Sequence, residues 1–384
     1  MRILFAADVS FNYYGEFQSV EQAQQVMGGT AEVFRSADFS MLNLENIFGK
    51  AEDHTPIYKS GPNLISSEDF VAFIDTLKPT AIGLANNHTG DFGEAPIYNT
   101  MALLKKKGYL LTGAGANVEE AYRPVVFEKD DVQVAVFAVC ENEFGTAKKN
   151  AAGSAGYDLT RVTHAIAGAR EKGQLPIIYF HGGNESNPFP STGKVALYRH
   201  FVDLGAAAVI AMHTHCPQGY EYYRGCPIVY SMGNFFFPDQ GDRSKKWTTG
   251  YMTMLDITAE SAKLDVIPYT FGMDHHTVMT GEEKEYFMNY LAFLNQEMAD
   301  EDKLQRYFEA WCVMDGINGY TRNLNYRKEM TVEPVHTMTA LKNLFSCEAH
   351  DELMRVSLNL IYEGRHNDLQ PEIDMIKKLQ NLEL

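Results

Sequence analysis

The chain has few cysteines, and their spacing excludes two kinds of site. Five cysteines occur in 384 residues, and no two of them form a CxxC pair. A disulfide framework and a thiolate zinc site both need paired or closely spaced cysteines, so neither is expected. The five thiols are therefore predicted to be reduced.

The chain also lacks a long apolar run. No stretch reaches the roughly 20 apolar residues that a membrane-spanning helix needs. The apolar run at the start of the chain is short, and Asp8 interrupts it. We therefore expect neither a signal peptide nor a membrane anchor, and we predict a cytoplasmic location.

Positive charge is scarce relative to negative charge. The sequence has 33 lysines and arginines against 50 aspartates and glutamates, which gives a formal net charge of −17. Such a balance repels nucleic acid phosphates and anionic membranes, and no long basic patch offsets it. The expected partner is therefore a small-molecule or polymer substrate, not a nucleic acid.

Short apolar runs alternate with helical patterns from residue 1 to about 270. Helical spacing occurs over 66–78, 93–108 and 193–205, and an apolar run follows each of these stretches. This alternation predicts an α/β domain. A pair of strands around Lys129 to Asp131 reads as a hairpin, so the sheets are expected to be mixed.

The pattern changes after His275 and His276. In the following residues, apolar side chains recur at helical spacing, with few glycines and few β-branched runs. We therefore predict a first domain over residues 1–275 and a helical extension over residues 276–384. His350 lies in this extension and is predicted to be a surface or helix-end histidine.

Two histidines follow a buried strand in the middle of the chain. The sequence AVIAMHTH places His213 and His215 directly after an apolar run. Side chains at positions i and i+2 of an extended chain point the same way, so the two imidazoles are placed to bind one ion. The alternative is that both histidines decorate an exposed strand end.

Four other predicted strands end in polar residues that suit a shared site. In α/β proteins, ligands gather at the carboxyl ends of the strands. The polar residues at these ends are Asp8, Glu45, Asn86, Asn87, His88, Asp91, His181, Asn184 and Glu185. This repetition favours one site over several unrelated solvated loops.

Brought together, these side chains would bind metal and activate water. Carboxylates from Asp8 and Glu45, with Glu45 able to bridge two ions, would join neutral oxygen and nitrogen atoms from Asn87, His181, His213 and His215. Mixed nitrogen and oxygen ligation suits one or two ions of Zn²⁺, Mn²⁺ or Fe²⁺ better than Ca²⁺.

His88 has a different predicted role from its neighbour Asn87. Adjacent residues do not easily bind the same ion, so His88 is a candidate proton donor, with Asp91 orienting it. Asparagine and aspartate side chains also satisfy turn backbone, and this alternative applies to Asn86, Asn87 and Asp91.

Three further residues are candidate substrate-binding groups. Lys59 would meet an anionic substrate, Glu185 would fix a ring proton or face the substrate, and Asn234 is the polar group of SMGNFFF. The alternative for Lys59 and Glu185 is a solvated loop charge.

Several motifs together resemble the CapA family of capsule and poly-γ-glutamate synthesis proteins, which share a metallophosphatase-like fold. The matching stretches are FAADVSF, LNLENIF, ANNHTGDFGEAPIYNT, HGGNE, and MHTHCPQGYEYYRGCPIVYSMGNFFF, in the order of the family. The resemblance implies a four-layer αββα sandwich with a metal centre at one edge. It also implies the ligand set given above, with His88 as proton donor. Ser10 and Gly182 depart from the usual histidine and tryptophan.

Two functions follow as hypotheses. The first is a metal-dependent hydrolase of phosphoesters, or of a related ester or amide, in capsule or poly-γ-glutamate metabolism. The second is a non-catalytic accessory protein of polymer synthesis or export that uses the same fold as a binding module. The ligand set and His88 favour the first, and Ser10 favours the second.

Overall fold

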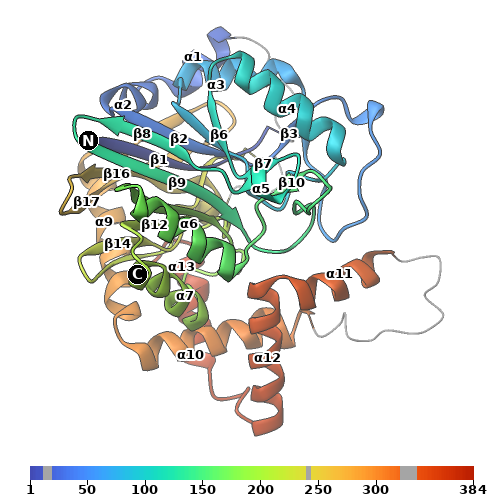
Figure 1. Cartoon of the computed structure of the whole chain (residues 1–384). Helices are drawn as coiled ribbons and strands as arrows, with labels where there is room; N and C mark the ends of the chain where they lie inside the picture. Colours follow the sequence, from blue (N-terminus) through green and yellow to red (C-terminus); the bar gives the residue numbers. More distant parts are fainter. Residues whose placement is uncertain (12–19, 239–243, 321–334) are drawn as a thin grey trace.

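The computed structural model describes residues 1–11, 20–238, 244–320 and 335–384. Two sheets lie face to face, with helices on their outer faces, and a group of helices packs below them (Figure 1). The predicted α/β four-layer sandwich with a helical extension is confirmed. Within the described ranges, no helix has the length and apolar character to span a bilayer.

The first sheet mixes parallel and antiparallel strands in the order β18-β17-β16-β1-β2-β5-β6, with β15 also paired to β1. Strands β2, β5, β6 and β15 continue the parallel direction of β1, and β16 to β18 form an antiparallel edge. The strands are β1 (Arg2–Val9), β2 (Phe39–Leu44), β5 (Ala81–Gly83), β6 (Leu110–Thr112), β15 (Asn234–Phe236), β16 (Thr249–Ile257), β17 (Ala262–Phe271) and β18 (His276–Val278).

The second sheet has the order β13-β14-β12-β11-β9-β8. Its four inner strands are parallel, and the predicted hairpin is confirmed as antiparallel β8 and β9, which turn at Asp130 with a φ of 53°. The strands are β8 (Val125–Lys129), β9 (Val132–Cys140), β11 (Leu175–His181), β12 (Ala208–Met212), β13 (Tyr220–Tyr223) and β14 (Cys226–Val229). Two short pairs are β3 (Ile47–Phe48) with β4 (Ile65–Ser66), and β7 (Ala114–Gly115) with β10 (Gly153–Ser154).

The two sheets share one apolar core. Tyr179 of β11 lies across from β1, where its hydroxyl donates a hydrogen bond of 2.5 Å to the Ala6 carbonyl. Its ring packs 5.7 Å from that of Phe5. Because side chains from both inner faces are fully buried, the strand ends of the two sheets are held at fixed positions relative to each other.

Two of the longer helices that flank the sheets begin at capping residues. The side chain of Asp158 accepts from the Arg161 amide at the start of α6, and Ser191 does the same for the Lys194 amide in α7. The flanking helices are α1 (Val20–Met27), α2 (Thr30–Ser36), α3 (Val71–Leu77), α4 (Glu94–Lys106), α5 (Val118–Ala121), α6 (Leu159–Glu171), α7 (Thr192–Asp203) and α8 (Lys245–Thr248), with 3₁₀ turns η1 (Ala51–Asp53) and η2 (Glu68–Phe70).

The helical extension follows β18. That strand pairs with β17 and ends at Val278, so the first helix of the extension begins at Gly281, slightly beyond the predicted boundary at residue 276. The elements are α9 (Gly281–Met298), α10 (Glu301–Trp311), a π-helical turn η3 (Cys312–Ile317), α11 (Val335–Ser346), α12 (Glu348–Glu363) and α13 (Gln370–Gln380). The division into two domains stays a prediction.

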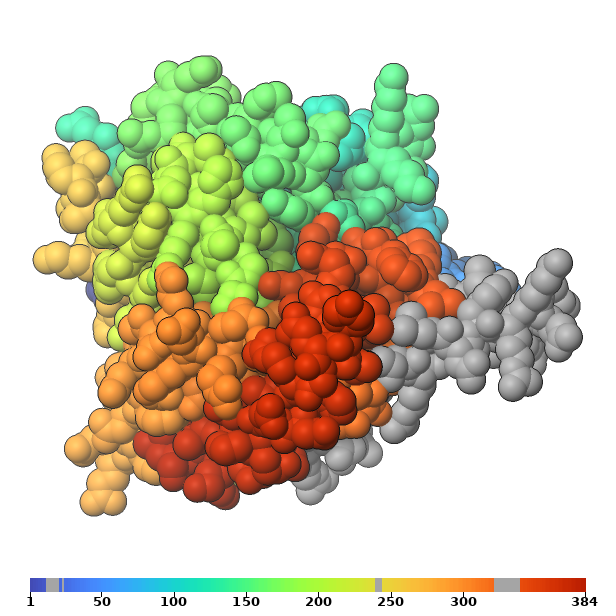
Figure 2. Space-filling view, turned by 90° about the horizontal axis from the view of Figure 1, so that it is seen from below, coloured from blue at the N-terminus to red at the C-terminus, as the bar shows by residue number. Residues whose placement is uncertain are grey.

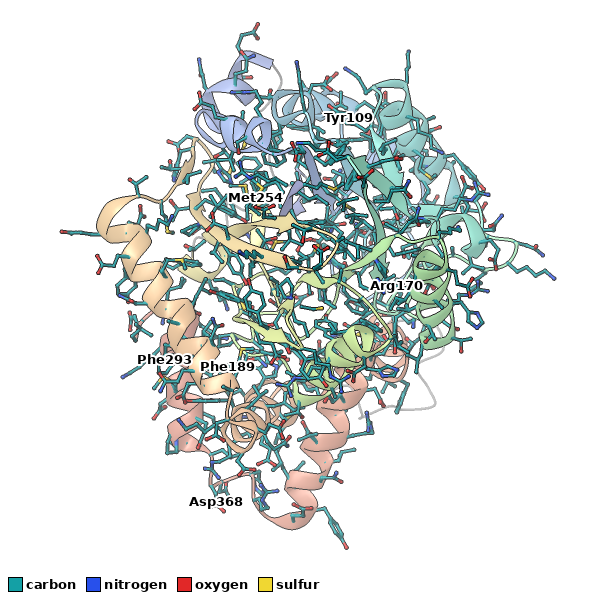
Figure 3. The ribbon with its side chains drawn as sticks, turned by 60° about the vertical axis from the view of Figure 1, so that its left-hand side comes forward. Tyr109, Arg170, Phe189, Met254, Phe293 and Asp368 are labelled. Atoms are coloured by element: carbon teal, nitrogen blue, oxygen red, sulfur yellow. The ribbon has the colours of Figure 1, made fainter. Side chains whose placement is uncertain are left out.

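Aromatic side chains join the extension to the sandwich. Phe189, which lies at the border between the two regions in Figure 3, stacks on Tyr307 of α10 with ring centroids 4.4 Å apart. Both rings are largely buried. This apolar contact fixes α10 beside the segment that precedes α7.

Candidate metal centre

Strands from both sheets direct polar side chains to one edge of the sandwich. Asp8 lies near the end of β1, Glu45 follows β2, His181 ends β11 and His213 follows β12. All four side chains are buried. The parallel strands of the two sheets thus bring together side chains that the sequence analysis placed at separate strand ends.

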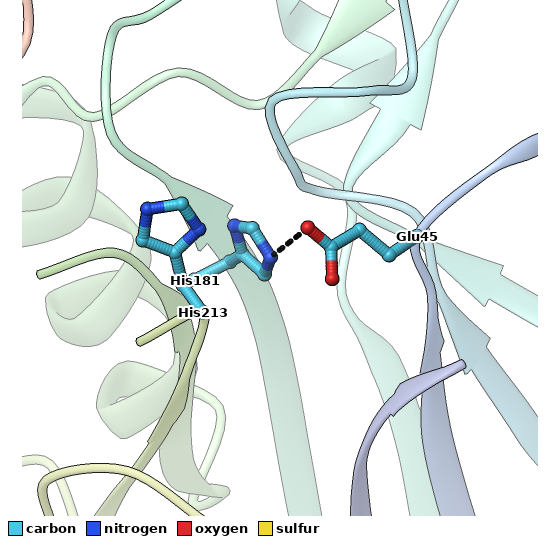
Figure 4. A group of neighbouring side chains, drawn as sticks. All are labelled: Glu45, His181 and His213. Atoms are coloured by element: carbon cyan, nitrogen blue, oxygen red, sulfur yellow. Dashed lines mark ion pairs between the residues drawn. The ribbon is translucent and has the colours of Figure 1, made fainter. Parts of the chain in front are cut away.

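A first group of possible ligands contains Glu45, His181 and His213. One atom from each lies within 4.8 Å of the other two. Figure 4 shows the two imidazoles beside the carboxylate, and the distance from His181 Nε2 to Glu45 Oε1 is 3.4 Å. This arrangement offers two nitrogens and one oxygen to a single ion.

A second group shares Glu45 with the first. Asp8, Glu45 and His215 also present atoms within 4.8 Å of one another. Asp8 is held in place by the Asn43 side chain, which donates to Oδ1 at 2.8 Å, and by the His213 amide, which donates to Oδ2 at 2.9 Å. Glu45 therefore lies where the predicted bridging carboxylate would be.

Several buried polar atoms at this edge have no hydrogen-bond partner among the described residues. They are Glu45 Oε1, Glu45 Oε2, Asn87 Oδ1, His181 Nε2 and His213 Nδ1. Leaving a buried polar atom unpaired costs about 1–3 kcal/mol, and more for a charged group. Lone pairs of this kind, on carboxylate, amide and imidazole atoms, are those that a transition metal binds, so the donor set fits a metal ion.

The two buried carboxylates of this edge, Asp8 and Glu45, have raised pKa values. Burial raises the pKa of Asp8 to about 6, and the neighbouring Glu45 carboxylate adds to the increase. Burial likewise raises the pKa of Glu45 to about 7, although His215 and His88 oppose the rise. A divalent cation between the two carboxylates would stabilise their charged forms and so lower both pKa values.

Two of the histidines are neutral at pH 7. Burial lowers the pKa of His181 to about 4 although the Asp8 carboxylate opposes the decrease, and burial together with the neighbouring His181 lowers the pKa of His213 to about 3. Neutral imidazole is the form that binds metal. For His215, burial lowers the pKa, but the carboxylates of Glu45, Glu185 and Asp8 outweigh it and raise the pKa above its usual value.

The HTH segment has an unusual backbone. His213 has a φ of 99° and His215 a φ of 53°, both in the left-handed region that residues with side chains rarely adopt. Such conformations cost on the order of 1–3 kcal/mol each and persist where surrounding contacts fix them. The hydrogen bond that the His213 amide donates to Asp8 helps to fix this backbone conformation.

Asn234 holds His215 in place. Its Oδ1 accepts from His215 Nδ1 at 2.7 Å, and its Nδ2 donates to the Trp247 carbonyl at 3.1 Å. Because Asn234 is fully buried and both polar groups are used, these bonds make it a positioning residue for His215. The substrate contact predicted for Asn234 stays a prediction.

His88, Asp91 and Lys59 form a separate cluster beside the candidate ligands. His88 Nδ1 lies 2.7 Å from Asp91 Oδ2, and Lys59 Nζ lies 2.7 Å from Asp91 Oδ1. The other ring nitrogen, His88 Nε2, lies 4.0 Å from Glu45 Oε1. Asp91 therefore orients His88 toward the candidate metal centre, and buried Lys59 is not the solvated loop charge that the sequence also allowed.

The two asparagines before His88 differ: one binds turn backbone, and the other has an oxygen free for a metal ion. Asn86 satisfies turn backbone, since its Oδ1 accepts from the His88 amide at 3.1 Å and its Nδ2 donates to the Leu44 carbonyl at 2.8 Å. Asn87 Oδ1, in contrast, is one of the unpartnered atoms. Asn86 is thus structural, and Asn87 remains a candidate ligand.

A cavity of about 250 Å³ lies beside His88. Glu185 lines it with a half-exposed side chain, and its Oε1 lies 4.0 Å from His213 Nε2. The sequence analysis missed other lining residues, namely Glu143, Tyr320, Asn343 and His350. Glu143 follows a strand end as the predicted residues do, so the same rule applies to it, whereas no local signal marks the other three.

For His350 the predicted helix-end position is confirmed, and the surface alternative is wrong. It lies in the first turn of α12, as predicted for a helix-end histidine, but only 9% of it is exposed. Its ring is bound by Tyr320 and Asn343. Packing between helices far apart in the sequence buries it, which its local sequence does not indicate.

A four-layer α/β sandwich with histidines and carboxylates gathered at one sheet edge defines a candidate metalloprotein. The chain belongs to a particular family within this class: the family model described as bacterial capsule synthesis protein PGA_cap matches residues 3–239. The predicted relation to CapA is confirmed. Strands β16 to β18 and the helical extension lie outside the matched residues.

Two bacterial proteins are similar in sequence to this chain. The PGA biosynthesis protein CapA of Bacillus subtilis is 26% identical over 241 residues, which are 62% of this chain and 63% of the relative. A probable polyglutamine synthesis accessory protein of Mycobacterium tuberculosis is 29% identical over 216 residues, which are 52% of this chain and 55% of the relative. The chain thus spans less than two thirds of the length of either relative.

Among solved structures, the protein TT1561 of Thermus thermophilus aligns with 69% of this chain and 98% of its own chain. The sequence identity is 13% and the TM-score is 0.38.

Proposed function

We propose that this protein is a metal-dependent hydrolase of the phosphoesterase type that acts in capsule or poly-γ-glutamate metabolism. The observation that carries the proposal is the set of buried, unpartnered atoms on Glu45, Asn87, His181 and His213. One or two ions of Zn²⁺, Mn²⁺ or Fe²⁺ would be held by Asp8, Glu45, Asn87, His181, His213 and His215.

A bound transition metal supplies a water of lowered pKa and polarises the oxygen of the group under attack. The residues of this chain would hold the metal and orient its ligands. Asp8 and Glu45 balance the positive charge, and the neutral rings of His181 and His213 leave lone pairs free. Asn234 fixes the direction in which His215 Nε2 points.

His88 is the proposed proton donor to the leaving group. Asp91 accepts the hydrogen bond of Nδ1 and so holds the ring with Nε2 toward the candidate ligands. A proton released from Nε2 would neutralise the leaving oxygen as its bond breaks. Asp91 does not contact the reacting atoms in this scheme, and its task is to hold His88.

The cavity sets the kind of substrate. Its volume of about 250 Å³ and its polar lining suit a small molecule or the end of a polymer chain, not a bulky apolar ligand. Lys59 lies at its wall next to His88, where it would favour an anionic group. This agrees with a phosphoester, or a related ester or amide bound to acidic groups.

The second candidate is a non-catalytic accessory protein of polymer synthesis or export. Ser10 favours it, because serine stands where the resemblance leads us to expect a metal-binding histidine. The name of the Mycobacterium tuberculosis relative, a probable polyglutamine synthesis accessory protein, agrees with such a role for this chain. In this case the site would bind without turnover.

Metal analysis followed by an activity panel separates the two. Protein purified without chelator is analysed for Zn, Mn and Fe, and is then tested on p-nitrophenyl phosphate, bis(p-nitrophenyl) phosphate and γ-glutamyl p-nitroanilide. We expect bound metal, and turnover that His88→Ala lowers by about 10²–10⁴-fold and that His164→Ala, at an exposed histidine of α6, leaves unchanged. Bound metal without turnover on any probe would favour the accessory role.

A further inference from the structure

The helical extension contacts the loops that carry the candidate metal centre. Glu348 of α12 accepts from the Asn142 amide at 3.0 Å and from the Asn142 side chain at 2.6 Å. One turn later, Glu352 accepts from the Gly193 amide at 2.9 Å and from the Ser191 hydroxyl at 2.5 Å. Figure 2 shows the orange and red extension packed against the green residues of the sandwich.

One set of contacts runs from the extension to a candidate metal ligand. Asn343 Nδ2, from α11, lies 3.2 Å from Glu143 Oε2 and 3.1 Å from His350 Nδ1. His350 Nε2 lies 3.0 Å from the Tyr320 hydroxyl. At the other end, Glu143 Oε1 lies 3.6 Å from His213 Nε2.

The donors and acceptors of this set are mutually consistent. The amide nitrogen of Asn343 has two hydrogens, and it has two acceptors, the Glu143 carboxylate and His350 Nδ1. His350 then carries its proton on Nε2 and donates it to the Tyr320 oxygen. Turning the amide over would place its oxygen against the carboxylate, so the orientation of Asn343 is fixed.

Glu143 lies beside only one nitrogen of His213, Nε2, and so influences which nitrogen carries the proton. A carboxylate beside Nε2 favours the tautomer with the proton on that nitrogen, and the lone pair is then on Nδ1. Nδ1 is the atom of His213 that is buried and without a hydrogen-bond partner among the described residues. At 3.6 Å the Glu143 carboxylate acts on Nε2 through its charge and not through a hydrogen bond, and a carboxylate beside the far nitrogen of a ligating histidine orients the ring and raises its basicity.

We propose that Glu143, Asn343 and His350 are positioning residues for His213, so that the helical extension is part of the metal centre. The proposal rests on the proposed metal-dependent function, and it concerns residues outside the family match in the case of Asn343 and His350. Asn343 is 4% exposed and His350 is 9% exposed, so water competes little with their hydrogen bonds.

The test measures metal affinity without any substrate. Full-length protein is stripped with a chelator and titrated with Mn²⁺ in a calorimeter. Removing a residue that positions a metal ligand typically costs 10–100-fold in affinity. We expect Glu143→Gln to weaken Mn²⁺ binding by about 10–100-fold and Asn343→Ala by about 10-fold.

Ser357→Ala is the matched control. Ser357 is fully buried in α12 and donates to the Cys312 and Leu353 carbonyls, so its loss loosens the extension without touching the chain of contacts to His213. Mn²⁺ affinity should stay at the wild-type value in this variant. Circular dichroism checks that each variant is folded, and His350→Gln replaces Asn343→Ala if the latter does not fold.

The possible results separate this inference from the proposed function. Weaker Mn²⁺ binding in Glu143→Gln and Asn343→Ala, with Ser357→Ala unchanged, supports the inference. Wild-type affinity in both Glu143→Gln and Asn343→Ala overturns the inference and leaves the proposed function standing. Equal weakening in Ser357→Ala also overturns it, since the extension would then act only through general stability. Absence of Mn²⁺ and Zn²⁺ binding to the wild type overturns both.

Discussion

Two neighbouring clusters at the same sheet edge differ in how their polar atoms are satisfied. Around Glu45, His181 and His213, buried oxygen and nitrogen atoms have no hydrogen-bond partner within the described part of the chain. Around Asp91, both carboxylate oxygens are used, by Lys59 at 2.7 Å and by His88 at 2.7 Å. The first cluster leaves lone pairs free for a ligand, and the polar atoms of Asp91 in the second cluster are all used.

In the proposed function, the first cluster binds the metal and the second cluster holds the proton donor. Asn87 and His88 are adjacent in the sequence, yet the Asn87 oxygen is unpartnered and the His88 ring is held by Asp91. A ligand needs a free lone pair, whereas a proton donor needs a fixed direction. The two clusters thus give neighbouring residues two different roles.

The largest expected effect is loss of metal from the first cluster. Replacing both His213 and His215 by alanine removes a nitrogen from each group of possible ligands that contains Glu45. We expect the bound metal to be lost, as measured by elemental analysis of protein purified without chelator. Unchanged metal content in the double variant would contradict the role given to the first cluster.

A second test addresses the separation of roles directly. His88→Ala removes the group that Asp91 orients but no predicted ligand, so metal content should stay constant while kcat falls by about 10²–10⁴-fold. The rate is measured on whichever probe the wild type hydrolyses. Loss of metal together with activity would make His88 a ligand and erase the distinction between the clusters.

A third test measures the stability of the second cluster. Asp91→Asn keeps the shape of the side chain but leaves the buried Lys59 ammonium without its ion-pair partner, which costs about 3–5 kcal/mol. Urea unfolding should show this loss. Adding Lys59→Met should restore part of it, because the unpaired charge is then gone, and a double variant less stable than Asp91→Asn would exclude Lys59 as the cause.

The smallest effect concerns His276, a buried histidine that belongs to neither cluster. Its Nδ1 lies 2.9 Å from Thr30 Oγ1 and its Nε2 lies 2.9 Å from the Phe235 carbonyl, so both nitrogens have partners. Burial lowers its pKa from 6.5 to about 3. His276 therefore binds a proton below about pH 6.5 in the unfolded chain but only near pH 3 in the folded chain. The free energy of unfolding falls as the pH drops through this window.

At pH 5 this linkage amounts to about 2 kcal/mol. The loss of unfolding free energy between pH 7 and pH 5 should be smaller by about that amount in His276→Gln than in the wild type. Metal content should not change in this variant. Equal losses in the two proteins would show that His276 is not the group that titrates.

Local patterns predicted the parts of the site that follow strands. Asp8, His181 and His213 lie at or next to the carboxyl ends of strands that the apolar runs identify, and parallel pairing brings such ends to one edge. The α/β class was predictable from the alternation of apolar runs and helical patterns, whereas the four-layer sandwich was expected from the resemblance to the CapA family. The period of the apolar pattern changes at the extension, although the three residues of β18 are too few to show a pattern of their own.

Partners from distant segments were not predictable. Asn343 contacts Glu143 across 200 residues of sequence, and Lys59 contacts Asp91 across 32. Neither pair has a spacing that a helix or strand would place on one face. Their contacts depend on how the helices and loops pack, which only the folded chain determines.

The most direct test of the account is the anomalous scattering of crystals grown from protein loaded with Mn²⁺. We predict a peak within bonding distance of Glu45, His181 and His213, and none beside the His88, Asp91 and Lys59 cluster. A map with no peak next to Glu45, or with a peak between His88 and Asp91, would contradict the assignment of the two clusters.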